Sequence, residues 1–192
     1  PVDTIAVGSA TLSGNADFDA NVSATNLTLT AGNAASETAV VDFASGTTAT
    51  ITAVTITGGA ADNSQDSTLT CTDCIGAITA ITLDDDVGQA TVAVANAAAR
   101  AFGGTIDGAT AGEGTLTVNE SDNTAAPDAV TFSGNIGGTA GLLAVTVGTD
   151  NSTAGNAVFS GNVTANTFTA ASGGHANEDT TVSIAGNLTA TT

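Results

Sequence analysis

The sequence of 192 residues contains no Lys, Trp, Tyr or Met, and it has one Arg and one His against 19 acidic residues. Its formal net charge is −18. Nucleic acids and anionic membranes are bound by clustered basic side chains, so we expect neither as a partner. The absence of Lys also excludes cross-links through a Lys amine. Because roughly 1 M salt shortens the Debye length to about 3 Å, a salty or divalent-rich medium outside the cell suits the chain best.

Long apolar runs are absent as well. No segment approaches the ~20 apolar residues of a membrane-spanning helix, and no signal peptide opens the sequence. Pro1 stands where a start Met is expected, which indicates that an N-terminal segment was removed or left out. We therefore predict an exported protein that is extracellular or displayed at the cell surface.

Side chains suited to catalysis are scarce. Arg100 is the one strong cation, and His175, the one imidazole, lies in the turn-like segment "SGGHANED". General acid–base and triad chemistry need positioned His, Lys or paired carboxylates in a cleft. We predict that the protein is not an enzyme and has no resident cofactor other than the calcium considered below. A carbohydrate-active enzyme is the least favoured alternative.

The two cysteines, Cys71 and Cys74, form the motif "CTDC". In an exported protein this spacing predicts a local disulfide that stiffens a turn, with free thiols as the alternative. A thioredoxin-like redox motif would need a βαβ context, and a zinc site would need more ligands than the sequence provides.

The chain is rich in Val, Ile, Leu and Ala for a thin core, in Thr for strands, and in Gly, Asn and Asp for turns. This composition predicts an all-β fold with an internal repeat. Leu27, Val54 and Ile81 are equivalent in "ATNLTLTAG", "ITAVTITGG" and "ITAITLDDD", and they are spaced by 27 residues. Phe132 and Phe159 show the same spacing of 27 independently.

The repeat slips between the two halves, where the next equivalents of Ile81 are Leu116 and Val145, at steps of 35 and 29. The extra residues coincide with an Ala-rich segment. Residues 95–102 of this segment are predicted to form a short helical insertion before a pair of glycines. A strand "TVAVAN" followed by a loop is the alternative.

Short alternating runs that recur with a long period are typical of a parallel β-solenoid, in which each repeat forms one coil and equivalent strands stack. We predict a single β-solenoid domain over residues 1–192, with about seven coils of about 27 residues. One or two β-sandwiches are the alternative, because their strands also recur every 8–12 residues or so. A sandwich, however, does not predict the 27-residue period.

The alternation also predicts a Thr-lined face. If Leu27 and Leu29 point inward, the neighbouring Thr side chains point outward and stack into columns, which is similar to the Thr-x-Thr arrays of ice-binding β-solenoids. The predicted face comprises Thr28, Thr30, Thr55, Thr57, Thr82, Thr117 and Thr146. The alternative is an ordinary exposed strand face, for which Thr is a favoured polar residue.

The segment "LDDDVG" places Asp84, Asp85 and Asp86 at the end of a strand. Calcium takes about six to eight oxygen ligands, so these three carboxylates are candidate calcium ligands. No EF-hand spacing is present, and a solvated acidic turn is the alternative.

Neither end of the predicted stack has a polar cap. The start "PVDTIAVGSATLSGN" is already an alternating strand, and the end "VSIAGNLTATT" breaks off within a repeat. The expected assembly edges are Val2, Ile5, Val7, Val182, Ile184, Leu188 and Thr189. Either the sequence is a fragment of a longer repeat protein, or the next subunit completes the last coil and forms a head-to-tail filament.

Units of the kind "FSGNVTANTFTAASGG", with few aromatics and no Lys, are similar to those of bacterial surface β-solenoid repeat proteins such as autotransporter passengers and filamentous adhesins. The resemblance implies extracellular display and a structural or adhesive role. We predict a subunit that self-assembles head-to-tail into a surface filament or matrix fibre, with itself as partner and surface carbohydrate as a further candidate. The alternative is a monomeric adhesin or ice-binding solenoid.

Overall fold

The computed structural model describes residues 1–34, 36–44, 46–61, 64–72, 77–96, 99–120, 129–148, 154–172 and 179–192. The chain is all-β in these residues, and its parallel strands stack as a β-solenoid of about 6 turns, with coils of about 25 residues. This confirms the predicted fold class. Across the described ranges, no helix is long and apolar enough to cross a membrane.

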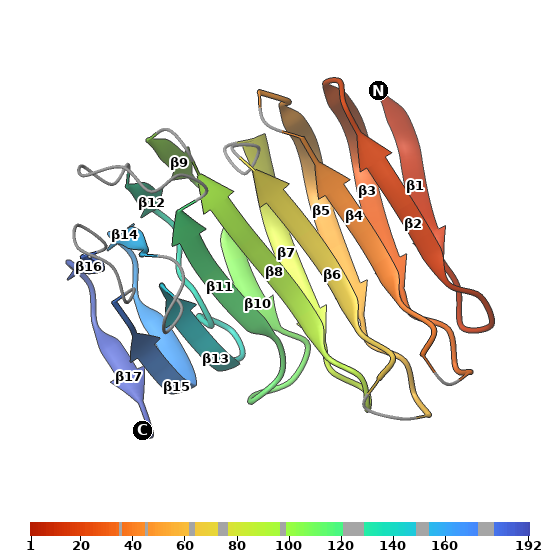
Figure 1. The fold of residues 1–192 in the computed structure, drawn as a ribbon. Coiled ribbons are helices and arrows are strands. Elements are labelled where there is room, and N and C mark those ends of the chain that lie inside the picture. The colour runs from red at the N-terminus through yellow and green to blue at the C-terminus, as the bar shows by residue number, and fades with distance from the viewer. Residues whose placement is uncertain are drawn as a thin grey trace.

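Two large sheets face each other across the core, and their strands run in opposite directions (Figure 1). The five-stranded sheet contains, in pairing order, β1 (Val2–Gly8), β3 (Val22–Thr30), β5 (Ala49–Thr57), β7 (Ile78–Asp84) and β10 (Thr105–Gly108). The eight-stranded sheet contains, from the N-terminal end, β2 (Gly14–Phe18), β4 (Ala39–Phe43), β6 (Ser67–Thr72), β8 (Ala90–Asn96), β11 (Thr115–Glu120), β13 (Leu142–Val147), β15 (Val163–Ala170) and β17 (Leu188–Ala190).

A third sheet belongs to the C-terminal part of the stack. Its four strands are, in pairing order, β9 (Arg100–Phe102), β12 (Val130–Phe132), β14 (Asn156–Phe159) and β16 (Thr181–Ile184). In Figure 1 these short strands lie beside the C-terminal half of the eight-stranded sheet, from green to blue. The cross-section of the solenoid therefore changes along its length.

The long strands of the five-stranded sheet bend once. In β3 the buried residues are Ala24, Leu27 and Leu29, so the alternation of inward and outward side chains breaks after Ala24. The pairing registers of β1, β3, β5 and β7 skip Thr25 and its equivalents Thr52 and Thr79, which are exposed. The bend lets one strand form two sides of a coil while keeping apolar side chains inward on both.

One aliphatic ladder runs through the core from end to end. In-register pairing connects Ile5, Leu27, Val54, Ile81, Ile106, Ile136, Val163 and Leu188. The six inner members are buried, whereas Ile5 is partly buried and Leu188 is exposed. Fully burying each such side chain stabilises the fold by about 1.5–3 kcal/mol, so stacking supplies what a single coil cannot.

The six Phe residues pack against one another in two groups, through two stacked and two edge-to-face ring pairs. Ring pairs lie at centroid distances of 5.1 Å (Phe18–Phe43), 6.0 Å (Phe102–Phe132), 5.0 Å (Phe132–Phe159) and 6.0 Å (Phe159–Phe168). Each group reaches one end of the solenoid, and its terminal ring, Phe18 or Phe168, is only partly buried.

The 27-residue period is confirmed where the sequence shows it most clearly. Leu27 pairs with Val54, Val54 with Ile81, and Phe132 with Phe159. The predicted step from Ile81 to Leu116 is wrong, because Ile81 pairs with Ile106, in the five-stranded sheet, and Leu116 belongs to the eight-stranded sheet. The strands of both sheets show the same alternation of inward and outward residues. Leu116 therefore resembles an equivalent of Ile81 in the sequence, although it lies on the other sheet.

The predicted helical insertion at residues 95–102 is also wrong for the residues described. Strand β8 extends to Asn96 and β9 begins at Arg100, while residues 97 and 98 lie outside the described ranges. Strand β8 is hydrogen-bonded to β6 on one side and β11 on the other. These two ladders satisfy its backbone groups and override the helix propensity of Ala.

Candidate functional site

The N-terminal end of the solenoid exposes the edges of β1 and β2, each of which has a neighbour in its sheet on one side only. Apolar side chains are uncovered there: Val2 is 52% exposed and Leu12 is 65% exposed. Ile5 and Phe18 are partly buried against the core, and Val7 is buried. Apolar side chains that a further coil would cover are therefore exposed to solvent at this end.

The C-terminal end exposes the edges of β16 and β17 in the same way (Figure 1). Leu188 is 46% exposed and Thr189 is exposed. Val182 and Ile184 pack partly buried against the core. The seven predicted edge residues thus lie at two opposite ends of the stack, and their role in assembly stays a prediction.

Charge is sparse at both exposed edges, although the chain carries a net charge of −18. Strands β16 and β17 contain no charged residue, β1 contains Asp3 and β2 contains Asp17. An unpaired edge with few charges lacks one of the usual protections against strand addition, although β16 and β17 are short.

Asparagine side chains join successive coils at the turns. The Oδ1 atom of Asn135 accepts a hydrogen bond from the backbone N–H of Asn162 at 3.0 Å. Oδ1 of Asn162 accepts the N–H of Asn187 at 2.9 Å. The Asn187 side chain is exposed, and its Oδ1 accepts no hydrogen bond within the described part of the chain. The ladder therefore ends on an open acceptor at the C-terminal end.

The predicted Thr face is divided between two sheets. Thr28, Thr55 and Thr82 form one outer column of the five-stranded sheet, and Thr30 and Thr57 begin a second, which continues to Asp84. The two other predicted members, Thr117 and Thr146, lie on the eight-stranded sheet. Their strands show the same alternation as those of the five-stranded sheet, so the sequence alone does not distinguish the two faces.

The eight-stranded sheet carries a more regular Thr array, which the sequence reasoning missed. Five paired strands carry the triplets "TLT" (β6), "TVA" (β8), "TLT" (β11), "AVT" (β13) and "TFT" (β15) in register. The first and third residues of each triplet lie on the outer face, and the middle residue points inward. Two adjacent columns of Thr and Ala result, and neither column contains a charged residue, although β11 ends at Glu120. The repeated Thr-x-Thr triplets were visible in the sequence, but their uneven spacing of 23 to 29 residues concealed their alignment.

Of the predicted calcium ligands, Asp84 is the last residue of β7, and Asp85 and Asp86 lie in the turn that follows. Both oxygens of Asp85 already accept backbone hydrogen bonds: Oδ1 from Ala90 N at 2.6 Å, and Oδ2 from Gly114 N at 2.8 Å. Gly114 has φ +79°, and a Cβ there would collide with Leu83, so the residue facing Asp85 must be glycine. Asp85 thus connects one coil to the next, while Asp86 is exposed.

Asp84 lies among like charges. Burial, followed by the negative charges of Glu113, Asp86 and Asp85, raises the pKa of Asp84 above its usual 3.8. Among the residues that the structure describes, no group of three or more His, Cys, Asp or Glu side chains is arranged to hold a metal ion. Calcium binding at Asp84, Asp85 and Asp86 stays a prediction.

Two of the four remaining candidates for chemistry lie outside the described residues. Cys71 is fully buried in β6, and Cys74 lies outside the described residues, so their disulfide stays a prediction. His175 also lies outside the described ranges. Arg100 is partly buried in β9 and pairs in register with Val130.

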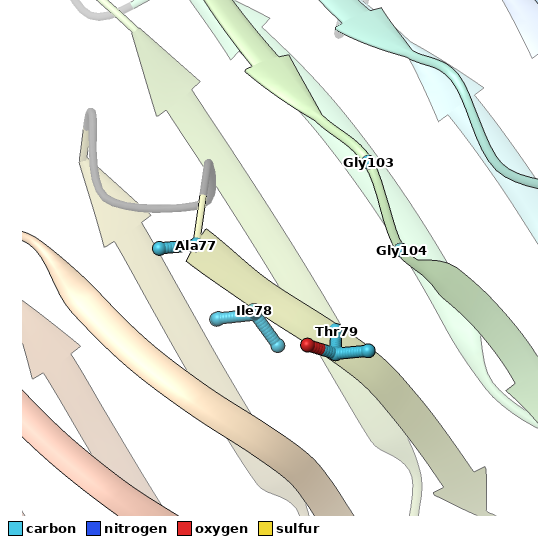
Figure 2. A pocket seen from close by; sticks show the side chains of 5 residues that line it. All are labelled: Ala77, Ile78, Thr79, Gly103 and Gly104. Carbon is cyan, nitrogen blue, oxygen red and sulfur yellow. The ribbon is translucent and has the colours of Figure 1, made fainter.

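A small hollow of about 230 Å³ lies between the start of β7 and the β9–β10 connection. Figure 2 shows its lining: Ala77, Ile78, Thr79, Gly103 and Gly104. The Thr79 hydroxyl is the one polar side-chain group in this lining. This set offers no acid, base or charged group to a substrate.

No protein-family model matches the chain, and no curated protein or solved structure is significantly similar to it. The candidate functional surfaces are therefore those that the fold presents: two open ends and two Thr-bearing faces.

Proposed function

We propose that the chain is a structural protein whose solenoids stack end to end into an extracellular fibre. The C-terminal edge of one copy, β16 and β17, joins the N-terminal edge of the next, β1 and β2. The observation that carries the proposal is the uncovered core at both ends, where Leu188 and Val2 are 46% and 52% exposed. Covering these side chains recovers hydrophobic stabilisation at about 25 cal/mol per Å².

The geometry of such a contact favours a polymer over a closed oligomer. The two surfaces are different, so each copy keeps one free end after it joins its neighbour. Adding a strand to an open parallel edge supplies main-chain hydrogen bonds and continues the sheet. The joint would repeat the coil-to-coil contacts that already hold the solenoid together.

The extracellular setting rests on charge and composition. A chain of net charge −18 without Lys is best tolerated where salt or divalent cations screen it. The similarity of its Thr-, Ala-, Gly- and Asn-rich units to bacterial surface solenoids supports the same setting. Surface display and a matrix role are part of the proposal.

Negative-stain electron microscopy of two matched variants tests the proposal. Leu188→Asp places a charge at the C-terminal edge, and Leu143→Asp places the same charge on β13 at a Leu that is 36% exposed. We expect fibres from the wild type and from Leu143→Asp, and single particles from Leu188→Asp. Discrete particles from all three proteins at high concentration would rule out end-to-end assembly.

The Thr array of the eight-stranded sheet favours a second candidate function, binding to an ordered surface such as ice. Its columns present hydroxyls and methyls at the strand spacing of about 4.8 Å, and neither column contains a charged residue from β6 to β15. Thermal hysteresis of the wild type, lost in Thr117→Arg and kept in Thr55→Arg on the opposite sheet, would support this candidate. The absence of hysteresis in the wild type would remove it.

A further inference from the structure

We propose a specific register for the joint: Leu188 of one copy pairs with Ile5 of the next. This inference rests on the proposed end-to-end assembly and adds which residues meet. It follows from the aliphatic ladder, because Ile5 is its first member and Leu188 is its last. The pairing of ladder residues within the solenoid is used as the pattern for their pairing between two copies.

The side chains at the two ends fit this pairing. Ile5 is partly buried against the core from one side, and Leu188 retains 46% exposure. Each inner member of the ladder has an aliphatic neighbour on both sides and is buried. Pairing Leu188 with Ile5 would give both end members the second neighbour that they lack.

The backbone bonds of the ladder also define what the joint must contain. The N–H groups of Ile136 and Val163 donate to the carbonyls of Asn162 and Asn187, at 2.9 Å and 2.8 Å. In return, Thr164 N–H donates to the Ile136 carbonyl at 2.9 Å. Each ladder residue therefore donates to the residue before its partner and accepts from the residue after it.

Continuing this rule across the joint assigns two main-chain hydrogen bonds. The Leu188 N–H would donate to the Thr4 carbonyl of the next copy, and the Ala6 N–H of that copy would donate to the Leu188 carbonyl. Within one chain, Thr4 and Ala6 pair in register with Asn26 and Thr28, so the opposite edge of β1 is the one that the joint would use.

The asparagine ladder assigns a third bond independently. Asn135 and Asn162 each accept, through Oδ1, the N–H of the residue that precedes the next ladder member. Asn187 holds the same place before Leu188, and its Oδ1 is open at the C-terminal end. In the proposed register the residue that precedes the next ladder member is Thr4, so its N–H would donate to Asn187 Oδ1.

Paired cysteine substitutions test the register directly. Residues 5 and 188 lie at opposite ends of one chain, so a disulfide between them forms only between copies. In-register parallel neighbours lie within the 4.4–6.8 Å or so between Cα atoms that a disulfide spans. The first variant combines Ile5→Cys with Leu188→Cys. The second, Ala6→Cys with Thr189→Cys, tests the adjacent outward-facing pair and leaves the core row unchanged.

The shifted control combines Ile5→Cys with Thr189→Cys, whose side chains point to opposite faces in the proposed register. After mild oxidation we expect a ladder of covalent multimers on non-reducing denaturing gels for both in-register pairs. The shifted control and the single-cysteine variants, which report exchange with Cys71 and Cys74, should give at least tenfold less multimer.

The outcomes separate the two proposals. Fibres that cross-link only through the shifted pair, or through none of the pairs, would overturn the register and leave end-to-end assembly standing. A wild type that forms no fibres under any salt condition would overturn the assembly itself. Cross-linked multimers from both in-register pairs would support both proposals.

Discussion

At the scale of single residues, Asp85 is the polar group that most directly ties one coil to the next. Its carboxylate accepts backbone hydrogen bonds from Ala90 in its own coil and from Gly114 in the following one. Hydrogen bonds to a charged acceptor contribute about 1.5–3 kcal/mol each. Asp85 therefore stabilises the fold through these two hydrogen bonds, whereas Asp86 in the same turn is exposed to solvent.

We predict that Asp85→Ala lowers the free energy of unfolding by about 2–4 kcal/mol, because two backbone N–H groups lose their acceptor. Asp86→Ala is the matched control, since Asp86 is exposed in the same turn. Urea unfolding followed by circular dichroism measures both. Equal, small effects of the two substitutions would contradict the role given to Asp85.

The raised pKa of Asp84 gives a pH-dependent prediction. A carboxyl whose folded pKa exceeds its unfolded value of 3.8 destabilises the fold above that pKa and carries no penalty below pH 3.8. Asp84→Asn should therefore stabilise the protein slightly at pH 7, since solvent screens this partly exposed carboxylate, and the gain should vanish as the pH falls toward 3.

Asp19→Asn removes the same charge from an exposed site and serves as control. Urea unfolding at pH 3 and pH 7 measures the free energy of both variants. An equal gain for both at pH 7 would assign the effect to net charge instead of to the neighbours Glu113, Asp86 and Asp85.

At the scale of elements, the aliphatic ladder is the feature that unites strands of different length and pairing. Ile106 and Ile136 continue a row that begins in the long strands β1, β3, β5 and β7. We predict that Ile106→Ala costs about 2–5 kcal/mol, because the cavity lies between two neighbours that the backbone holds in place. Thr105→Ala, on the outer face of the same strand, should cost less than about 1 kcal/mol.

Thermal or urea unfolding followed by circular dichroism compares Ile106→Ala with Thr105→Ala. A similar loss of stability in both variants would mean that the ladder row is not a continuous core. A larger loss in Ile106→Ala is the expected result.

The sequence allowed the repeating elements to be predicted where alternation and spacing agree. Leu27, Val54 and Ile81 lie in long alternating strands at constant spacing, so their stacking could be predicted without a structure. Phe132 and Phe159 could be paired for the same reason. In each case the pattern inside a strand is long enough to define which side chains face inward.

Other rows could not be predicted, for physical reasons. Ile106 occurs in the four-residue strand "TIDG" and Ile136 in "NIGG", outside the named strands, so neither segment is long enough for a pattern to be recognised in the sequence. Strand β9 has three residues and carries no pattern of its own. Ala95 and Asn96 belong to an Ala-rich segment that favours a helix locally, and the pairing of β8 with its neighbouring strands holds these two residues in a strand.

At the scale of the whole molecule, the solenoid is a one-dimensional stack whose two ends differ from its middle. Every inner coil has a coil on each side, although β9 and β10 also end their sheets, while β1 and β2 at one end and β16 and β17 at the other have a neighbour on one side only. In repeat proteins the terminal units are usually capped by polar surface. Here, within the described residues, both ends carry aliphatic side chains and few charges.

Salt should strengthen assembly because each joint brings together two bodies of net charge −18. Raising sodium chloride from about 0.01 M to about 1 M shortens the Debye length from about 30 Å to about 3 Å. We predict that the critical concentration for pelleting falls at least tenfold over this range. An unchanged or rising critical concentration would contradict a joint formed by apolar, weakly charged edges.

Calcium chloride provides a control for this salt effect. Matched ionic strengths of calcium and sodium chloride should act alike if screening alone is involved. A stronger effect of calcium that is lost in Asp84→Asn or Asp86→Asn would support the calcium site predicted from the sequence.

The most direct test of the central claim is sedimentation velocity of the wild type over a hundredfold range of concentration in high salt. End-to-end stacking predicts an open series of species at successive multiples of the monomer mass, with an average size that rises continuously with concentration. Leu188→Asp should reduce this series to the monomer, and Leu143→Asp should preserve it. A wild type that stays monomeric, or that stops at one closed oligomer, would contradict the account.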